Sequence, residues 1–157
     1  MQLIMNRRAQ AGAGLIESLI SLFVVSIGFL GLAGLELSGL TASNNSLLRS
    51  KAVYLSYQMA DRLRANLPGV ASGAYDNLTG DPASPGCIAS ACDAVQVAAN
   101  DYAEWNAEVA AVLPGGTGTI CLTSTSGACD GAGDVYAITI RWTEKGKQHT
   151  FVNAMRP

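Results

Sequence analysis

An uncharged run of eighteen residues near the N-terminus constrains this chain more than any other feature. The run covers residues 18–35 and lies between two acids, Glu17 and Glu36. An α-helix of that length is roughly 27 Å long, close to the hydrocarbon thickness of a bilayer. The sequence therefore predicts a membrane-spanning helix at the front of the chain.

The residues ahead of this helix predict its orientation. Residues 1–12 carry only two charges, Arg7 and Arg8. By the positive-inside rule the N-terminus stays cytoplasmic, and everything beyond about Leu40 lies across the membrane. A cleaved secretory signal fits less well, because its apolar region is usually about 7–15 residues long and no A-x-A-like site follows Leu35. A simple membrane anchor and a buried core helix also fit an apolar run of this kind.

The remaining composition argues against several classes of function. The chain has 10 Lys plus Arg and 12 Asp plus Glu, and this net charge of −2 argues against a nucleic-acid partner and against a polybasic membrane clamp. Four cysteines and one histidine leave few residues for acid–base or metal chemistry. There is no phosphate-binding glycine loop, and residues 130–134 lack the ligand series of an EF-hand calcium loop. We therefore expect no enzymatic activity, no cofactor and no metal.

Glu17 is the residue that separates the interpretations of the apolar helix. A carboxylate one turn inside such a helix costs about 2.5–3.5 kcal/mol on insertion scales, so an intramembrane acid is expected to have a function and a partner. Alternatively, Glu17 lies in the headgroup layer and is solvated. The position of the acid alone leaves both interpretations open.

The residues around Glu17 resemble a known processing signal. Residues 11–18, Ala-Gly-Ala-Gly-Leu-Ile-Glu-Ser, are similar to the class III signal of type IV prepilins and of type II secretion pseudopilins. The resemblance implies that a prepilin peptidase cuts between Gly12 and Ala13, that the Ala13 amine is methylated, and that Glu17 becomes the fifth mature residue. It also implies that the Glu17 carboxylate meets the N-terminal amine of a neighbouring subunit. Ala13 and Gly14 stand where the family usually has Phe and Thr.

The helix is expected to continue beyond the membrane to about Asn66. Residues 41–67 contain no Pro or Gly, and their apolar positions recur every three or four residues, at Leu48, Ala52, Leu55, Met59 and Leu63. Pro68-Gly69 is expected to end the helix. Residues 59–66, Met-Ala-Asp-Arg-Leu-Arg-Ala-Asn, resemble the string that closes this helix in the PilV family of minor pilins, the type IV pilus modification proteins. From helix physics alone they form an exposed helix end, with Arg62 and Arg64 on its solvated or interface side.

Residues 68–157 are predicted to form a globular head with a second helix. Residues 69–87 are turn-rich and predict a surface connection with room for one edge strand. Asp93 and Gln96 form a capping-box signature, and Pro114 ends the helix that follows. The apolar stripe expected on that helix consists of Val95, Ala98, Tyr102, Trp105, Val109 and Val112.

The rest of the head is predicted to be an antiparallel sheet. Strands are expected at residues 119–123, 135–143 and 149–154, with a hairpin turn around Gly146. In the middle strand, Tyr136, Ile138, Ile140 and Trp142 lie on one face, and Ala137, Thr139 and Arg141 lie on the other. His149 is expected to be solvated. The fold class is therefore α+β, with the sheet packed on the second half of the long helix, as the pilin fold also implies.

The four cysteines predict two disulfides if the head lies in an oxidising compartment. Three pairings are possible. We favour Cys87 with Cys92 and Cys121 with Cys129, because each bond closes a loop with little apolar content of its own. A zinc site is the alternative, but the spacings do not match two C-x₂₋₄-C pairs.

Together these features divide the chain into a leader (residues 1–12), a membrane and assembly segment (13–40), an amphipathic helix (41–67) and a periplasmic head (68–157). The resemblance implies a minor pilin that initiates or caps the type IV pilus and supports adhesion and twitching motility. Its implied partners are other minor pilins, a tip-associated adhesin, the major pilin and the prepilin peptidase. A type II secretion pseudopilin and a plain membrane-anchored periplasmic binding domain are the competing interpretations. The sequence leaves open the position in the fibre, the partner interfaces and any ligand of the head.

Overall fold

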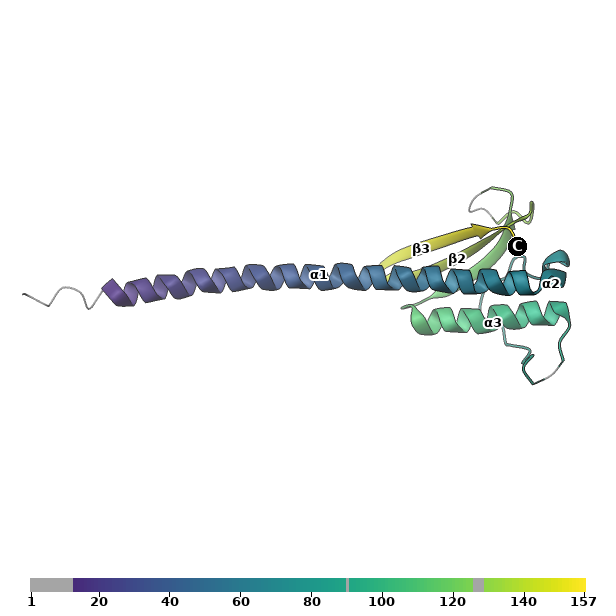
Figure 1. Cartoon of the computed structure of the whole chain (residues 1–157), viewed down its shortest axis with the longest axis horizontal. Coiled ribbons are helices and arrows are strands. Elements are labelled where there is room, and N and C mark those ends of the chain that lie inside the picture. The colour runs from purple at the N-terminus through teal and green to yellow at the C-terminus, as the bar shows by residue number, and fades with distance from the viewer. Residues whose placement is uncertain (1–12, 90, 126–128) are drawn as a thin grey trace, which may run out of the picture. The chain divides into compact units, whose positions relative to one another are not determined.

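The computed structural model describes residues 13–89, 91–125 and 129–157. It divides the chain into two compact units, residues 1–44 and 45–157. Helix α1 (Ala13–Ala65) contributes to both units, and all other helices and strands belong to the second (Figure 1). The chain is thus of the α+β class, with one long N-terminal apolar helix and a small antiparallel sheet.

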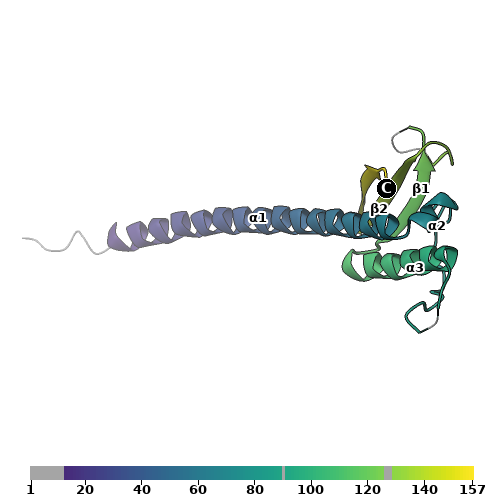
Figure 2. The ribbon, with the colours of Figure 1, turned by 45° about the vertical axis from the view of Figure 1, so that its right-hand side comes forward.

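The second unit is built on the apolar stripe of α1. Leu48, Ala52, Leu55, Met59 and Leu63 are all buried, as their spacing predicts. They pack with residues of α3 (Ala94–Val112) and of the sheet in one hydrophobic core. Within this unit α1 and α3 run side by side, and the sheet packs against them (Figure 2).

The expected surface connection after α1 is partly wrong. Residues Leu67–Ala71 form a short helix, α2, and Asn66 caps it by accepting a hydrogen bond from the Gly69 N–H. Pro68 lies in the first turn of α2, where its missing N–H costs nothing. The expected edge strand is reduced to a single bridge between Leu78 and Ile120. Tyr75, inside this segment, is fully buried.

Helix α3 begins and ends where the sequence predicts. Both capping-box hydrogen bonds between Asp93 and Gln96 are present, and the helix ends two residues before Pro114. Ala98, Tyr102, Trp105 and Val109 are buried, and Val112 is packed against the core. Val95 is 54% exposed, so its assignment to the stripe is wrong. Because it lies in the first turn, the core does not reach it.

The sheet has three strands in the order β1 (Thr117–Thr123), β2 (Val135–Glu144) and β3 (Lys147–Met155). Both pairs are antiparallel, and each strand contains the expected residues. Lys145 and Gly146 form the two-residue turn between β2 and β3, both with positive φ. This is the backbone conformation of a type I′ hairpin turn.

The structure adds two details to the expected sheet. Ala137 and Thr139 are buried although they lie on the face opposite the core residues of β2. Both are short side chains on the central strand, which is paired on one side with β1 and on the other with β3. His149 is exposed, as expected, and its ring also stacks on Trp142 with the ring centroids 5.4 Å apart. The register that pairs these two residues follows from the two-residue turn.

Candidate functional site

The first candidate site is the apolar surface of residues 14–40. Every side chain in this range is exposed, and its large hydrophobic residues are 51–75% accessible. An apolar surface this extensive is not stable in water and needs a bilayer or other helices to cover it. The helix is long and apolar enough to span a membrane. Residues 14–40 therefore have the length and the exposed apolar surface that a membrane-spanning helix requires.

Glu17 lies within this segment, in a shallow surface depression that it shares with Ile16, Ile20 and Ser21. Residues 13–44 contain no Lys, Arg or His. The described part of the first unit, residues 13–44, thus has no side-chain cation that could neutralise this carboxylate. Charge compensation for Glu17 in an apolar medium has to come from outside residues 13–44.

Two serine hydroxyls of the segment, and the hydroxyl of Thr41 just after it, are hydrogen-bonded within the helix. The hydroxyls of Ser18, Ser26 and Thr41 each donate to a backbone carbonyl three or four residues earlier. This arrangement suits a helix in lipid, where unpaired polar groups are costly. Gly28, Gly31 and Gly34 have no neighbouring atom where a side chain would lie, so other helices can approach α1 closely there.

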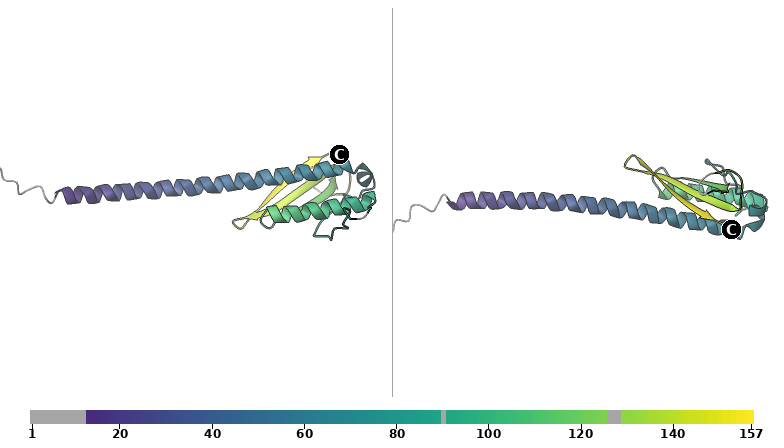
Figure 3. Two further views of the ribbon diagram at one scale, coloured as in Figure 1. Left: turned by 60° about the horizontal axis from the view of Figure 1, so that its bottom comes forward. Right: turned by 90° about the horizontal axis from the view of Figure 1, so that it is seen from above.

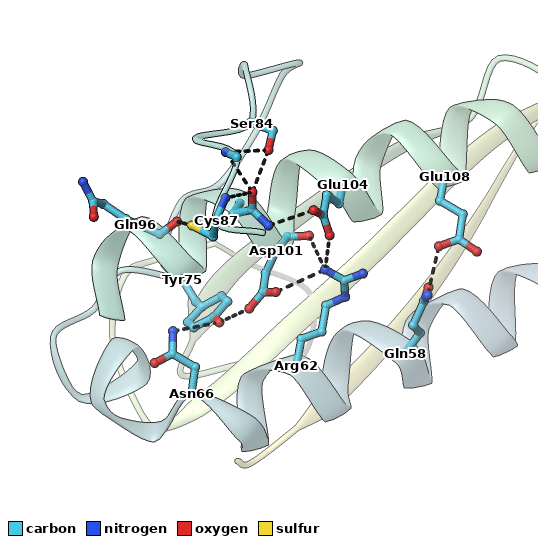
Figure 4. Close-up of polar contacts among 12 residues, drawn as sticks. Gln58, Arg62, Asn66, Tyr75, Ser84, Cys87, Gln96, Asp101, Glu104 and Glu108 are labelled. Atoms are coloured by element: carbon cyan, nitrogen blue, oxygen red, sulfur yellow. Dashed lines mark hydrogen bonds and ion pairs between the residues drawn. The ribbon is translucent and has the colours of Figure 1, made fainter. Parts of the chain in front are cut away.

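The second candidate site is a polar clamp between α1 and α3 (Figure 4). One Arg62 nitrogen lies 3.1 Å from an Asp101 carboxylate oxygen and 3.2 Å from a Glu104 oxygen. Asp101 and Glu104 are three residues apart on α3, so both carboxylates face the same guanidinium. The clamp joins residue 62 to residues about forty positions later in the chain.

Two further residues extend the clamp into the head. The Tyr75 hydroxyl donates to Asp101 at 2.6 Å, and the Asn66 amide donates to Tyr75 at 3.1 Å and to the Ala94 carbonyl at 2.8 Å. Burial and the hydrogen bond to Asp101 raise the pKa of Tyr75 well above its usual value. The phenol therefore stays protonated and keeps donating to Asp101 at any physiological pH.

The string at residues 59–66 thus has a structural role that helix physics alone does not predict. Met59, Ala60, Leu63 and Asn66 are buried, and Arg62 is held by two acids. Asp61, Arg64 and Ala65 form the expected exposed helix end, where Asp61 and Arg64 pair with each other. The shared face of Asp101 and Glu104 on α3 is the one signal in the sequence that could have pointed to these partners.

The clamp makes a prediction about pH. The hydrogen bond from Asn100 and the ion pair with Arg62 lower the pKa of Glu104. A lowered pKa stabilises the folded state above the ordinary glutamate pKa of about 4.3, and this contribution is lost as the pH falls below it. We expect Glu104→Gln to reduce the free energy of unfolding by less than about 1 kcal/mol at neutral pH, since the pair is partly exposed.

Urea unfolding at pH values from 7 to 3 measures this effect. The difference between wild type and Glu104→Gln should shrink as the pH drops below about 4.3. Glu108→Gln is the matched control. Glu108 lies one turn after Glu104 on α3 and also contacts α1, but it accepts its hydrogen bond from the neutral Gln58 amide. A constant difference at every pH for Glu104→Gln would contradict the assigned cause.

The cysteines are paired as the low apolar content of the two loops favours. Cys87 is bonded to Cys92, and Cys121 is bonded to Cys129. Asn100 supports the first loop by accepting hydrogen bonds from the Ser84 hydroxyl and from the Gly86 and Cys87 N–H groups. Among the described residues, no group of three His, Cys, Asp or Glu side chains is placed to hold a metal.

The expected cleavage residue, Gly12, lies outside the described residues, and Ala13 is the first residue of α1. Glu17 is therefore in the second turn of the helix. Comparison with protein-family models, with curated proteins and with solved structures finds no match.

Proposed function

We propose that this chain is a minor pilin of the type IV pilus, similar to the PilV family, with a pilin fold. The observation that carries the proposal is the exposed apolar helix with Glu17 near its start and no cation within residues 13–44. Such a helix needs both an apolar environment and a cation from outside residues 13–44. A fibre of packed helices with free N-terminal amines provides both.

The free energies of insertion and of charge pairing suggest that Glu17 fixes the axial register of the subunit. Two opposite charges about 4 Å apart gain about 4 kcal/mol at an effective dielectric constant near 20, against about 2.5–3.5 kcal/mol for inserting the acid. Pairing with the amine of a neighbouring subunit therefore compensates the cost of burial. A subunit at the wrong axial position would leave the charge unpaired, which favours one register.

Processing would create the amine at the right place. Cleavage after Gly12 removes Arg7 and Arg8, which leaves eight basic and twelve acidic residues and a net charge of −4. The new N-terminus is the methylated Ala13, four residues before Glu17. Before assembly the chain would span the bacterial inner membrane once, with the N-terminus cytoplasmic and the head in the periplasm, where the two disulfides can form.

The head would provide contacts rather than catalysis. Its role would be to join other minor pilins, the major pilin and a tip-associated adhesin at the start or tip of the fibre. Through these partners the protein would support adhesion and twitching motility. The resemblance to type IV prepilins supports these roles.

A deletion strain tests the proposal against its nearest alternative. We expect loss of the gene to reduce surface pili and twitching, and expression of the full chain to restore both. Secreted enzymes should be unaffected. A strain with normal pili and reduced enzyme secretion would instead support a type II secretion pseudopilin, and a strain with neither defect would support a plain membrane-anchored domain.

A further inference from the structure

The charged residues of the second unit are unevenly distributed. Residues 45–157 contain eight basic and ten acidic residues. Three of the basic residues form ion pairs with acids: Arg62 with Asp101 and Glu104, Arg64 with Asp61, and Arg156 with Asp134. Five basic residues lie in other parts of the unit, Arg49, Lys51, Arg141, Lys145 and Lys147, and Lys145 has an interaction partner of its own.

These five residues lie at one end of the unit, which we call the basic end. Arg49 and Lys51 belong to the first turns of α1 in this unit, and the other three lie on or near the β2–β3 turn. The Asn45 amide contacts the Glu144 carboxylate, which brings α1 and the turn together. The turn and the C-terminal end of α3 lie at this end of the unit in Figure 3, and α2 lies at the other.

Basic residues outnumber acids at the basic end, where the acids are Glu144 and, near the C-terminal end of α3, Glu108. Glu144 is only 9% exposed and is held by Asn45, whereas Arg49, Arg141, Lys145 and Lys147 are exposed. A groove of about 250 Å³ opens there between α1 and β3, lined by Asn45, Ser46, Arg49, Trp142, Glu144, His149 and Thr150. The volume of this groove is sufficient for a small charged group.

Acids gather toward the opposite end of the unit. Asp101 contacts Tyr75, Asp76 accepts a hydrogen bond from the Leu122 N–H, and Asp134 lies beside Leu67 of α2 in a surface groove. The net charge of the whole chain conceals this separation. A polybasic membrane contact, which the net charge argues against, is therefore supported locally.

We propose that the basic end docks on the anionic phospholipid headgroups of the membrane that α1 spans. The short connection between the apolar run and the head favours lipid as the partner. The uncharged run ends at Leu35, and the second unit begins at Asn45, only ten residues later. Ten helical residues cover about 15 Å, so the chain itself tethers the start of the basic end within that reach of the last residue of the run. Cations within about 10 Å of an anionic surface are attracted to it at moderate salt.

The docked head would hold the subunit against the bilayer before assembly. Extraction into a fibre would then have to release these headgroup contacts as well as the apolar helix. The inference requires only that α1 spans the membrane. It does not require the chain to be a pilin, so its failure leaves the proposed function standing.

Fluorescence quenching in nanodiscs tests the docking with the full chain. A fluorophore is attached at Gln148→Cys, without reduction of the disulfides, and quenched by lipids that carry a nitroxide on the headgroup. We expect stronger quenching in discs containing phosphatidylglycerol than in discs of phosphatidylcholine alone. About 0.5 M NaCl should remove the difference, a test that needs no further substitution.

Charge substitutions locate the contact. Each cation near an anionic surface changes binding about fivefold, so Arg49→Gln with Lys147→Gln should lower the ratio of docked to undocked heads roughly twenty-fold. The control is Arg64→Gln with Arg156→Gln, which removes the same charge outside the basic end and should leave quenching unchanged. Equal quenching in both lipids, or an equal loss in the control, would overturn the proposal. Quenching that is independent of lipid charge and stronger in discs with two chains would also overturn the proposal. The basic end would then bind the acids of a second copy of the chain.

Discussion

Replacement of Glu17 by alanine is expected to leave membrane insertion intact and to lower incorporation into pili at least tenfold. The variant helix is more apolar than the wild type, so insertion should not suffer. In the fibre, however, the amine of the neighbouring subunit would lose its partner and remain buried and charged. Unpaired buried charges cost several kcal/mol, and about 1.4 kcal/mol already corresponds to a tenfold change in an equilibrium.

The measurement compares the amount of the protein in sheared pili with the amount in the membrane fraction. Glu36→Ala is the matched control, because Glu36 is the acid at the other end of the same uncharged run. We expect this control to be incorporated normally. Normal incorporation of Glu17→Ala would contradict the pairing mechanism, whatever the total number of pili.

Trp105→Ala is expected to have the largest effect on the stability of the head, about 3–5 kcal/mol. The side chain is fully buried, and its Nε1 donates to the Leu55 carbonyl at 2.8 Å, which ties α3 to α1. The ring also packs directly on Gly118 of β1, where a Cβ atom would lie 2.2 Å from the ring. The substitution therefore leaves a cavity where both helices and the sheet meet.

Urea unfolding of the full chain in detergent, followed by circular dichroism, measures this loss. Native domains are stable by only about 5–15 kcal/mol, so the variant head should be marginally folded or unfolded. Val95→Ala is the control, because this exposed residue lies on the same helix and should change stability by less than about 0.5 kcal/mol. Similar losses in the two variants would show that Trp105 is not central to the core.

The features that depend on local sequence could be predicted. The stripe of α1 from Leu48 to Leu63 follows from the helical period, and the start of α3 follows from the Asp93 capping box. The antiparallel order of the strands follows from the alternation in β2 and the short turn at Gly146. In each case the signal lies within a few consecutive residues.

The features that depend on packing could not be predicted. The sequence indicates a solvated or interface side for Arg62, because nothing near it in the chain shows that Asp101 and Glu104 lie opposite. Their contact depends on how α1 and α3 align, which the long-range packing determines. Helix α2 escapes prediction for a different reason: Pro68-Gly69 usually ends a helix, but Pro is also favoured in a first turn.

For the functional residues too, local features could be predicted and features that depend on packing could not. The apolar run and the isolated charge of Glu17 are visible in the sequence, whereas the separation of charge within the head is not. Arg49 and Lys147 are almost a hundred residues apart, and only the fold places them at one end. Net charge is a property of composition, and local charge is a property of the fold.

The mature N-terminus tests the central claim most directly. The full chain is expressed in a host that carries a prepilin peptidase, purified from the membrane and analysed by intact-mass and N-terminal mass spectrometry. We predict a chain that starts at Ala13 with a methylated amine, four residues before Glu17. A chain that retains Met1 to Gly12 under these conditions would contradict the account, because the cation that is to neutralise Glu17 would not exist.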